Sequence, residues 1–260
     1  MIKDMPKVFW QVQPDNSAWD DWQDMALNTN LLYEVMEPIT NDRLSLQESE
    51  KYARYRDSRR INALHGAFID VNPASGDPQF KEISRQRCRQ SCEIAAQIGA
   101  GYVVFHSSCF PFLRGVYLDS WSDQCAAFYA QLAEEYGLKI CVENSMDLDP
   151  TPLQKLMEKT ESSSVCVCLD IGHANYSRAP LDAWFDQLGP WIGYMHLSDN
   201  RGSFDEHLPL GKGNVDWSTA DRLWRQLRGE IPMTLEVGGV ECVRESLRFL
   251  RKCGYFGMGE

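Results

Sequence analysis

A regular alternation of two kinds of segment along the 260 residues is the feature that most constrains the fold. Short apolar runs typical of buried strands are followed by longer stretches with the apolar periodicity and capping residues of helices. The strand-like runs are residues 7–12, 31–36, 60–69, 102–106, 139–143, 165–170, 192–196 and 233–237. The helical stretches are residues 20–28, 46–58, 80–98, 120–136, 152–159, 181–188, 218–227 and 240–252.

Eight strand–helix units in a chain of this size predict an α/β fold, a single (β/α)8 or TIM barrel, which typically takes about 250 residues. A doubly wound open sheet is the runner-up, but no glycine-rich phosphate-binding loop follows the first strand-like run. Gly99, Gly137 and Gly254 stand where three of the helices are expected to end. Because the sequence has no linker, repeat or low-complexity tract, we expect one domain over residues 1–260.

The composition narrows the class of protein. An apolar fraction of 43% and a charged fraction of 24% are ordinary for a globular chain. No apolar run approaches the ~20 residues of a membrane helix, and the first six residues lack a signal core, so we expect a cytoplasmic protein. Nine cysteines without a Cys-x-x-Cys pair indicate reduced, mostly buried thiols. A net charge of −11 argues against a broad nucleic-acid footprint, although it leaves room for a local basic patch or a metal cluster that handles phosphate.

Histidines and carboxylates stand at or just beyond the ends of strand-like runs three to eight. They are His65, His106, Glu143, Asp170, His173, His196 and Glu236. Asp205 and His207 follow on the loop after the seventh run, from which they can fold back over the strand ends. Barrel enzymes build their active sites at these ends, and buried imidazoles and carboxylates are costly unless something pairs with them. Mixed nitrogen and oxygen donors suit Zn²⁺, Mn²⁺, Fe²⁺ or Co²⁺ better than Ca²⁺ or Mg²⁺, so the pattern predicts a metal site.

Three stretches carry a family resemblance. They are Cys168-Leu169-Asp170-Ile171-Gly172-His173-Ala174, His196-Leu197-Ser198-Asp199-Asn200 and Asp205-Glu206-His207-Leu208-Pro209-Leu210-Gly211-Lys212-Gly213. Through them, and over most of the chain from about Arg60 to Glu236, the sequence resembles the xylose isomerase-like barrel superfamily. Because that superfamily contains sugar isomerases, sugar epimerases and endonuclease IV, the resemblance implies a metal-dependent barrel enzyme without choosing one reaction.

The resemblance implies two sets of metal ligands. Sugar epimerases of the superfamily bind one ion through two glutamates, an aspartate and a histidine, which correspond to Glu143, Asp170, His196 and Glu236. Endonuclease IV binds three zinc ions, and its additional ligands match His65, His106, His173, Asp205 and His207. Since all nine residues are present, we expect one to three ions per chain, with zinc or manganese as the leading metals.

Five of the nine have an alternative role. His65 and His106 could hydrogen-bond a substrate or a backbone carbonyl, and His173 could orient Asp170 as a neighbour of the ligand shell. Asp205 and His207 could instead lie in a solvent-exposed turn.

Five further residues are candidates for substrate binding. Trp10, near the end of the first run, and Phe68, three residues past His65, could wall the pocket. Asn144 could bind substrate hydroxyls, although a turn-stabilising role fits it better. Arg201 and Lys212 are the cations near the strand ends that could recognise a phosphate.

Two mechanisms follow from these residues. In a sugar isomerase or epimerase, Glu143 and Glu236 exchange a proton with carbon beside a metal-polarised carbonyl. In an endonuclease IV-like phosphodiesterase, two or three ions activate water, and the same glutamates hold ions. We expect the first, with a small sugar or sugar phosphate as substrate, because the acidic chain fits a long nucleic acid poorly. A non-catalytic sugar- or metal-binding barrel is the third interpretation, and homo-oligomer formation stays open.

Overall fold

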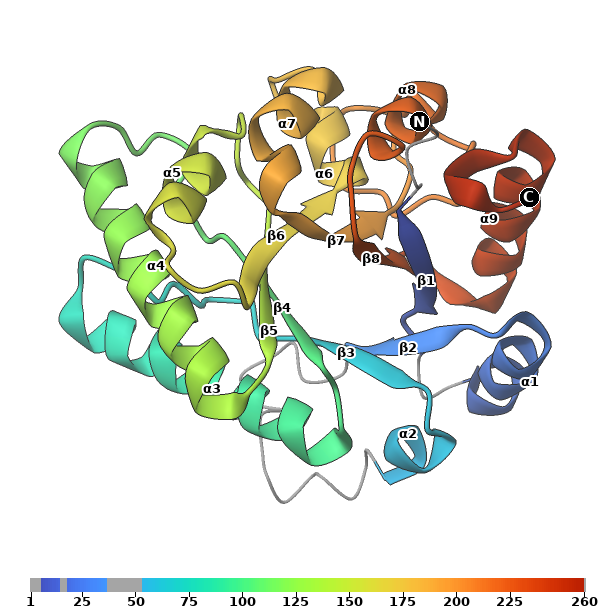
Figure 1. The fold of residues 1–260 in the computed structure, drawn as a ribbon, viewed down its shortest axis with the longest axis horizontal. Helices are drawn as coiled ribbons and strands as arrows, with labels where there is room; N and C mark the ends of the chain where they lie inside the picture. The colour runs from blue at the N-terminus through green and yellow to red at the C-terminus, as the bar shows by residue number, and fades with distance from the viewer. Residues whose placement is uncertain (1–5, 15–17, 37–52, 260) are drawn as a thin grey trace. The chain divides into compact units, whose positions relative to one another are not determined.

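The computed structural model describes residues 6–14, 18–36 and 53–259, and its strands follow one another in the order β1 to β8 of a closed parallel barrel (Figure 1). The strands are β1 Lys7–Val12, β2 Leu32–Val35, β3 Ile61–His65, β4 Tyr102–His106, β5 Lys139–Glu143, β6 Val165–Asp170, β7 Ile192–Leu197 and β8 Glu230–Leu235. The helices are α1 Trp19–Thr29, α2 Ala53–Ser58, α3 Pro78–Ile98, α4 Val116–Tyr136, α5 Thr151–Lys159, α6 Ile171–Tyr176, α7 Leu181–Leu188, α8 Trp217–Trp224 and α9 Gly239–Cys253, with 3-10 turns η4 Gly189–Trp191 and η5 Tyr255–Gly257. The predicted (β/α)8 fold is therefore confirmed.

Most predicted elements agree with the structure, and the differences have local causes. The predicted helix 46–58 is described only from Ala53 onward, and its earlier part lies outside the described residues. Helix α6 was not predicted, because it follows β6 without any intervening loop residue. Asp170, the last residue of β6, also caps this helix, and its carboxylate accepts a hydrogen bond from the His173 N–H at 2.6 Å. Among the described residues, no helix is both long and apolar enough to cross a bilayer.

The chain divides into two compact units. The first unit comprises residues 1–32, 148–150 and 168–260, and the second comprises residues 33–147 and 151–167. The expectation of one domain over the whole chain stays a prediction.

In the first unit, β8 pairs in parallel with both β1 and β7. The register with β1 runs from Lys7 opposite Glu230 to Val12 opposite Leu235. A buried polar chain crosses these strands, because the Gln11 amide donates to Tyr194 Oη at 2.8 Å and Tyr194 Oη lies 3.0 Å from the Thr234 hydroxyl.

Trp10 belongs to an aromatic cluster and not to the strand-end pocket that the sequence suggested. Its ring lies 6.5 Å from that of the buried Phe256, which also contacts the rings of Trp217 and Trp224 at 6.4 and 5.5 Å. Side chains alternate along a strand, so the neighbouring Gln11, which reaches Tyr194, takes the opposite face from Trp10. This alternation corrects the predicted role of Trp10 as a pocket wall.

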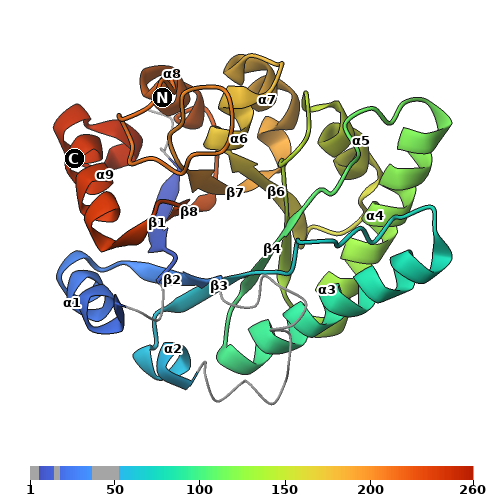
Figure 2. The same cartoon turned by 180° about the vertical axis from the view of Figure 1, so that it is seen from behind.

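In the second unit, the parallel strands β2 to β5 are flanked by two long helices, α3 and α4, which lie side by side in both views (Figures 1 and 2). Helix α3 begins at the Asp77 cap, whose carboxylate accepts from the Phe80 N–H at 2.8 Å. Both helices end at glycines in the left-handed region, Gly99 with φ 83° and Gly137 with φ 65°, as predicted.

The loop after β7 folds over toward α6 (Figure 2) and is held by the buried Asp199 carboxylate. This carboxylate accepts hydrogen bonds from the N–H groups of Gly211 at 2.8 Å and Val215 at 3.2 Å, and from the Trp217 indole at 3.0 Å. Only glycine fits at position 213, because a Cβ there would lie 2.2 Å from the Asn200 carbonyl oxygen. The loop that carries Asp205 and His207 is thereby fixed at both ends.

We predict that Asp199→Ala lowers the free energy of unfolding by about 3 kcal/mol or more, because it leaves the buried donors of Asn200, Val215 and Trp217 without their acceptor, at roughly 1–3 kcal/mol each. Urea unfolding of chelator-treated protein, followed by circular dichroism, measures this loss. Asp216→Ala is the matched control, since it removes only the exposed cap of α8, which is worth about 1 kcal/mol. Equal losses in the two variants would contradict the role given to Asp199.

Candidate metal centre

In the second unit, three strand ends bring His65, His106 and Glu143 together, and we call these residues the His65 cluster. They are the last residues of β3, β4 and β5, and the register places His106 directly opposite Glu143. Nε2 of His65 lies 3.4 Å from Glu143 Oε2, and Nε2 of His106 lies 3.6 Å from the same oxygen. One ligand atom from each residue lies within 4.8 Å of the other two, so the cluster could hold a metal ion.

Phe68 packs against both imidazoles of the His65 cluster. Its ring stacks on that of His106 at 4.3 Å with an interplanar angle of 24°, and it meets the His65 ring edge-on at 5.2 Å. Phe68 therefore packs against both histidine rings, and its role as a wall of a substrate pocket stays a prediction.

In the first unit, the Asp205 carboxylate joins two histidines, and we call His173, Asp205 and His207 the Asp205 cluster. Asp205 Oδ2 lies 3.1 Å from His173 Nε2 and 2.7 Å from His207 Nε2. The other oxygen, Oδ1, is buried and has no hydrogen-bond partner among the described residues, so it has capacity for a further ligand. Asp205 therefore contacts both His173 and His207, and metal binding by these three residues stays a prediction.

Two histidines, one in each unit, are anchored to the backbone in the same way. Nδ1 of His65 lies 3.0 Å from the Gly66 carbonyl oxygen, and Nδ1 of His207 lies 2.8 Å from the Glu236 carbonyl oxygen. Because a carbonyl only accepts, Nδ1 carries the proton in both rings, and in the neutral ring the Nε2 lone pair faces a carboxylate. A lone pair held against a carboxylate needs a cation, either a proton on the ring or a metal ion between the two groups. Metal-binding histidines commonly show this backbone anchor.

The charge state of the Asp205 cluster follows from this contact. Burial alone would lower the pKa of His207, but the hydrogen bond to Asp205 and the nearby Glu236 carboxylate outweigh it and raise the pKa to about 9. Burial alone would raise the pKa of Asp205, yet its hydrogen bonds to His173 and His207 hold that pKa well below its ordinary value. Without a metal ion, the cluster is an ion pair at neutral pH.

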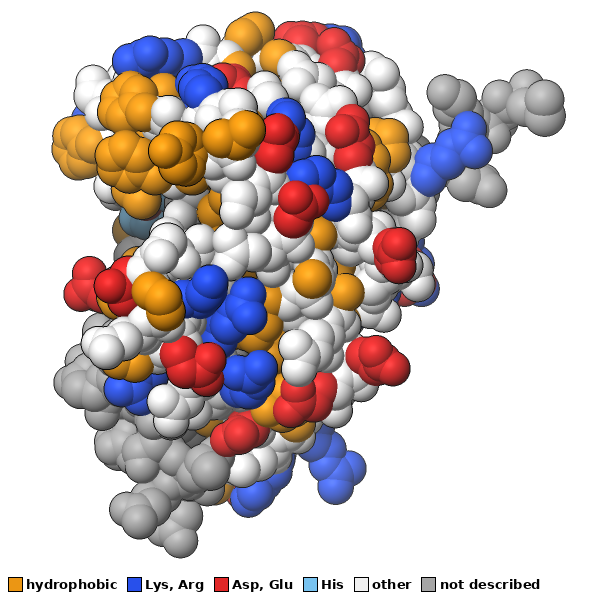
Figure 3. All heavy atoms as spheres, turned by 90° about the vertical axis from the view of Figure 1, so that its left-hand side faces the viewer, with side chains coloured by type: hydrophobic (Ala, Val, Ile, Leu, Met, Phe, Trp, Pro, Cys, Tyr) orange, Lys and Arg blue, Asp and Glu red, His pale blue; other side chains and the backbone are white. Residues whose placement is uncertain are grey.

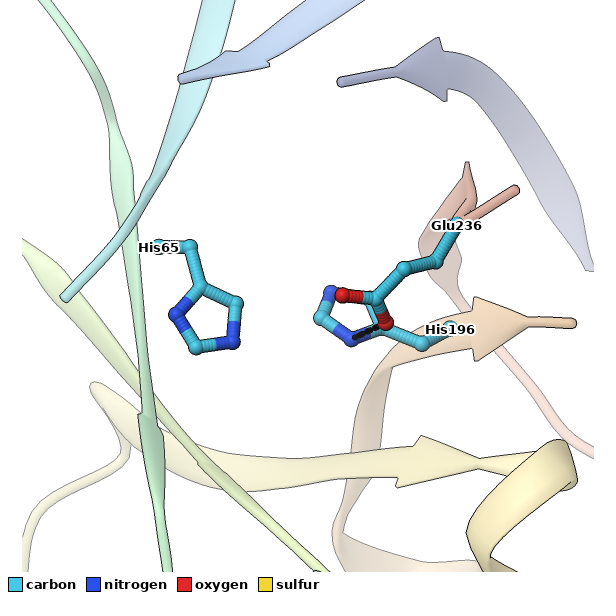
Figure 4. Close-up of side chains that lie close together, drawn as sticks. All are labelled: His65, His196 and Glu236. Carbon is cyan, nitrogen blue, oxygen red and sulfur yellow. Dashed lines mark ion pairs between the residues drawn. The ribbon is translucent and has the colours of Figure 1, made fainter. Parts of the chain in front are cut away.

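The first unit also holds His196, Glu236 and Asp170 at the ends of β7, β8 and β6. His196 Nδ1 lies 3.0 Å from Glu236 Oε2, the ion pair drawn in Figure 4, and both side chains are buried. Asp170 is fully buried at the start of α6, where the backbone N–H of His173 donates to it. The His173 ring lies between two carboxylates, with Nε2 3.1 Å from Asp205 and Nδ1 3.9 Å from Asp170.

Sequence reasoning missed two polar residues near these strand ends. The Gln13 amide donates to Glu236 Oε1 at 3.1 Å and thus orients one candidate ligand. Its position just after the first strand is the signal that could have found it. Glu34 is a fully buried carboxylate on β2, next to a register shift between Tyr33 and Glu34, and an acidic residue inside an apolar run was the available sign.

Arg201, Lys212 and Asn144 are the remaining residues that were predicted to bind substrate. Arg201 forms an ion pair with Glu206 and donates its main-chain N–H to that carboxylate at 2.8 Å, while Lys212 Nζ lies 3.6 Å from Glu245. Asn144 is buried directly after β5. Both cations that were expected to recognise a phosphate are therefore already paired with glutamates.

Comparison with known proteins agrees with the fold. Residues 31–253 match the model of the family described as xylose isomerase-like TIM barrel. An uncharacterized protein of Methanocaldococcus jannaschii, MJ1311, is 29% identical over 165 residues, which are 59% of this chain and 56% of that protein. The chain thus spans little more than half the length of this curated relative.

Solved structures are similar over nearly the whole chain. A D-tagatose 3-epimerase-like protein has a TM-score of 0.76 at 22% identity, covering 94% of this chain and 96% of its own. The IOLI protein with a bound zinc atom has a TM-score of 0.73 at 14% identity, covering 96% and 99%. Endonuclease IV from Thermus thermophilus has a TM-score of 0.61 at 21% identity, covering 95% and 98%. At these identities the likeness establishes a shared fold.

We predict that the Asp205–His207 pair stabilises the metal-free protein most in mildly acidic solution. The His207 contribution is fully present below its ordinary pKa of 6.5 and is lost as the pH rises through about 9. The Asp205 contribution is present above its ordinary pKa of 3.8 and is lost as the pH falls further. The difference in Tm between wild type and His207→Ala, measured in chelator from pH 4 to 10, should therefore shrink above pH 6.5. Phe204→Ala, an exposed neighbour, is the control, and a difference that stays constant across this range would refute the assignment.

Proposed function

We propose that this chain, which belongs to the xylose isomerase-like TIM barrel family, is a divalent-metal-dependent isomerase or epimerase that acts on a sugar or sugar-like substrate. The observation that carries the metal dependence is the His65 cluster, in which the backbone anchor of His65 turns its Nε2 toward the Glu143 carboxylate. Imidazole nitrogen and carboxylate oxygen together are the donor set of zinc and manganese sites, so these residues fit such an ion.

Glu143 and Glu236 are the residues that would transfer the substrate proton. A divalent ion, when bound, supplies Lewis-acid polarisation of a substrate carbonyl, which acidifies the neighbouring C–H. Glu143 is the last residue of β5 and Glu236 directly follows β8, and active sites of TIM barrels are built at this end of the strands. In the proposed reaction, one carboxylate removes the proton from carbon and the other returns it. Gln13, through its hydrogen bond to Oε1, would hold Glu236 in position for this step.

A small, weakly charged substrate fits the electrostatics better than a long polyanion. Arg201 and Lys212 are each paired with a glutamate, so neither presents an uncompensated charge. On the face formed by α3 and α4, Lys and Arg side chains are interspersed with Asp and Glu (Figure 3). Nucleic-acid binding depends on clustered cations that displace counterions from phosphates, and the net charge of −11 opposes it.

A second function, phosphoester hydrolysis of the endonuclease IV type, is favoured by one observation. The Asp205 cluster places two imidazoles within 3.1 Å of one carboxylate oxygen, a set that a one-ion isomerase does not need. Here the cluster would hold an additional ion, and multinuclear sites stabilise both oxygens of a phosphoester displacement.

Glu143→Gln and Glu236→Gln separate the proton-transfer function from simple binding. We expect each variant to slow deuterium incorporation from D2O into a turned-over keto sugar by about 10²- to 10⁴-fold, because each lacks one proton carrier. Mass spectrometry of a panel of free and phosphorylated keto sugars measures the exchange, with metal content determined on the same samples. A variant that keeps both its ion and the wild-type exchange rate would remove that glutamate from the mechanism.

Metal content and His207→Ala distinguish the two functions. The isomerase predicts close to one ion per chain, measured by elemental mass spectrometry of protein purified without added metal or chelator. The isomerase also predicts that His207→Ala changes sugar turnover less than about 3-fold. His207 is not a ligand of its single ion, and only the loss of a residue that supports the reacting metal lowers activity strongly. Two or three zinc ions per chain, with His207→Ala abolishing cleavage of abasic-site DNA or another phosphoester, would establish the hydrolase instead.

A further inference from the structure

Strands β5 and β6 bring two thiols into contact. Sγ of Cys141 and Sγ of Cys166 are 3.4 Å apart. The register explains the contact, because the Ile140 N–H donates to the Ser164 carbonyl at 2.9 Å. In parallel pairs of this sheet, a residue that donates to one carbonyl lies opposite the next residue, as Lys139 donates to Gly101 and lies opposite Tyr102. Ile140 therefore lies opposite Val165, and Cys141 lies opposite Cys166.

This placement suits a disulfide. Neighbouring strands lie about 4.7–4.9 Å apart, within the roughly 4.4–6.8 Å range of Cα separations that disulfides span. The two sulfurs must approach from 3.4 Å to about 2.05 Å, a change within reach of side-chain rotation.

Cys166 is more exposed than the other cysteines of this unit. Cys166 is partly exposed, while Cys141 is buried behind it. Cys88, Cys92 and Cys125 are buried, and burial raises the pKa of the Cys88 thiol to about 12, which suppresses the reactive thiolate. Cys166 is thus the thiol of the pair that an oxidant in solution meets first.

We propose that Cys141 and Cys166 are a redox-sensitive pair that forms an intramolecular disulfide when a peroxide oxidises the protein. The Cys166 sulfur attacks hydrogen peroxide, so that an S–O bond forms, the O–O bond breaks and one water leaves. The Cys141 sulfur then attacks the sulfur of this sulfenic acid, so that the S–S bond forms and the S–O bond breaks. The released hydroxyl group takes the Cys141 thiol proton and leaves as a second water. Two thiols are oxidised to one disulfide, and the peroxide is reduced to two waters.

The cross-link would join β5 to β6 two residues before Glu143 of the His65 cluster. Because side chains alternate along a strand, Cys141 lies on the same face of β5 as Glu143, two residues before it. A bond to β6 at this point fixes the strand segment that carries Glu143. The proposal rests on the sulfur geometry alone and holds whichever reaction the protein catalyses.

The test uses the full chain carrying Cys242→Ser and Cys253→Ser, which removes the more accessible thiols of α9. The reduced protein is treated with hydrogen peroxide, quenched with an alkylating reagent under denaturing conditions, and mapped by tandem mass spectrometry. We expect two of the seven remaining thiols to escape alkylation, with a peptide pair linked through Cys141 and Cys166. Adding Cys141→Ser should abolish the link and leave Cys166 as a sulfenic acid that dimedone traps.

Cys168→Ser is the matched control, since Cys168 lies two residues further along the same face of β6. The link should persist in this control, and fragment ions should place it at Cys166. The proposal fails if all seven thiols stay free at a peroxide concentration that oxidises Cys253 in the parent protein, or if the link joins any other pair. Should a variant not fold, mapping of the unsubstituted chain tests for the same link.

Discussion

The parallel register of neighbouring strands decides which side chains of this protein meet. Where β4 and β5 end together, His106 comes to lie opposite Glu143, and β3 brings His65 to the same carboxylate. Along β5 and β6 the register also sets two thiols against each other. A slip of one residue in any of these pairs would turn the polar groups to the other face of the sheet, so the candidate site depends on the ladder of backbone hydrogen bonds.

Backbone carbonyls then decide which ring nitrogen each anchored histidine offers. The anchors at Gly66 and Glu236 commit the Nδ1 proton of His65 and His207, so only Nε2 remains for the carboxylate or for an ion. Glu236 therefore contributes twice, since its main chain orients His207 and its side chain meets His196. The two loops that follow β7 and β8 are linked through this single residue.

The sequence alone was sufficient for the fold class, and it placed candidate site residues at the strand ends, because both inferences depend on local patterns. Apolar runs gave the bounds of β4, β5 and β6, and polar residues at their ends gave His106, Glu143 and Asp170. The contact between Asp205 and His173 spans 32 residues and depends on a loop fixed by Asp199, which no periodicity reveals. Trp10 was expected to wall the pocket because it lies near the end of the first strand, but position along a strand does not show which face a side chain takes. The contacts of Gln11 with Tyr194 and of Trp10 with Phe256 show that these neighbours take opposite faces.

The charges of Asp205 and His207 balance each other in the metal-free protein. With a pKa of about 9, His207 holds a proton at neutral pH, and that proton compensates the Asp205 carboxylate. In the proposed second function, His207 would have to give up this proton to hold an ion through Nε2, so binding at the cluster would strengthen as the pH rises toward 9. Nδ1 stays bonded to the Glu236 carbonyl in either form, so the ring need not turn. The proton on His207 therefore keeps the ring in the position that the ion of the proposed second function would need.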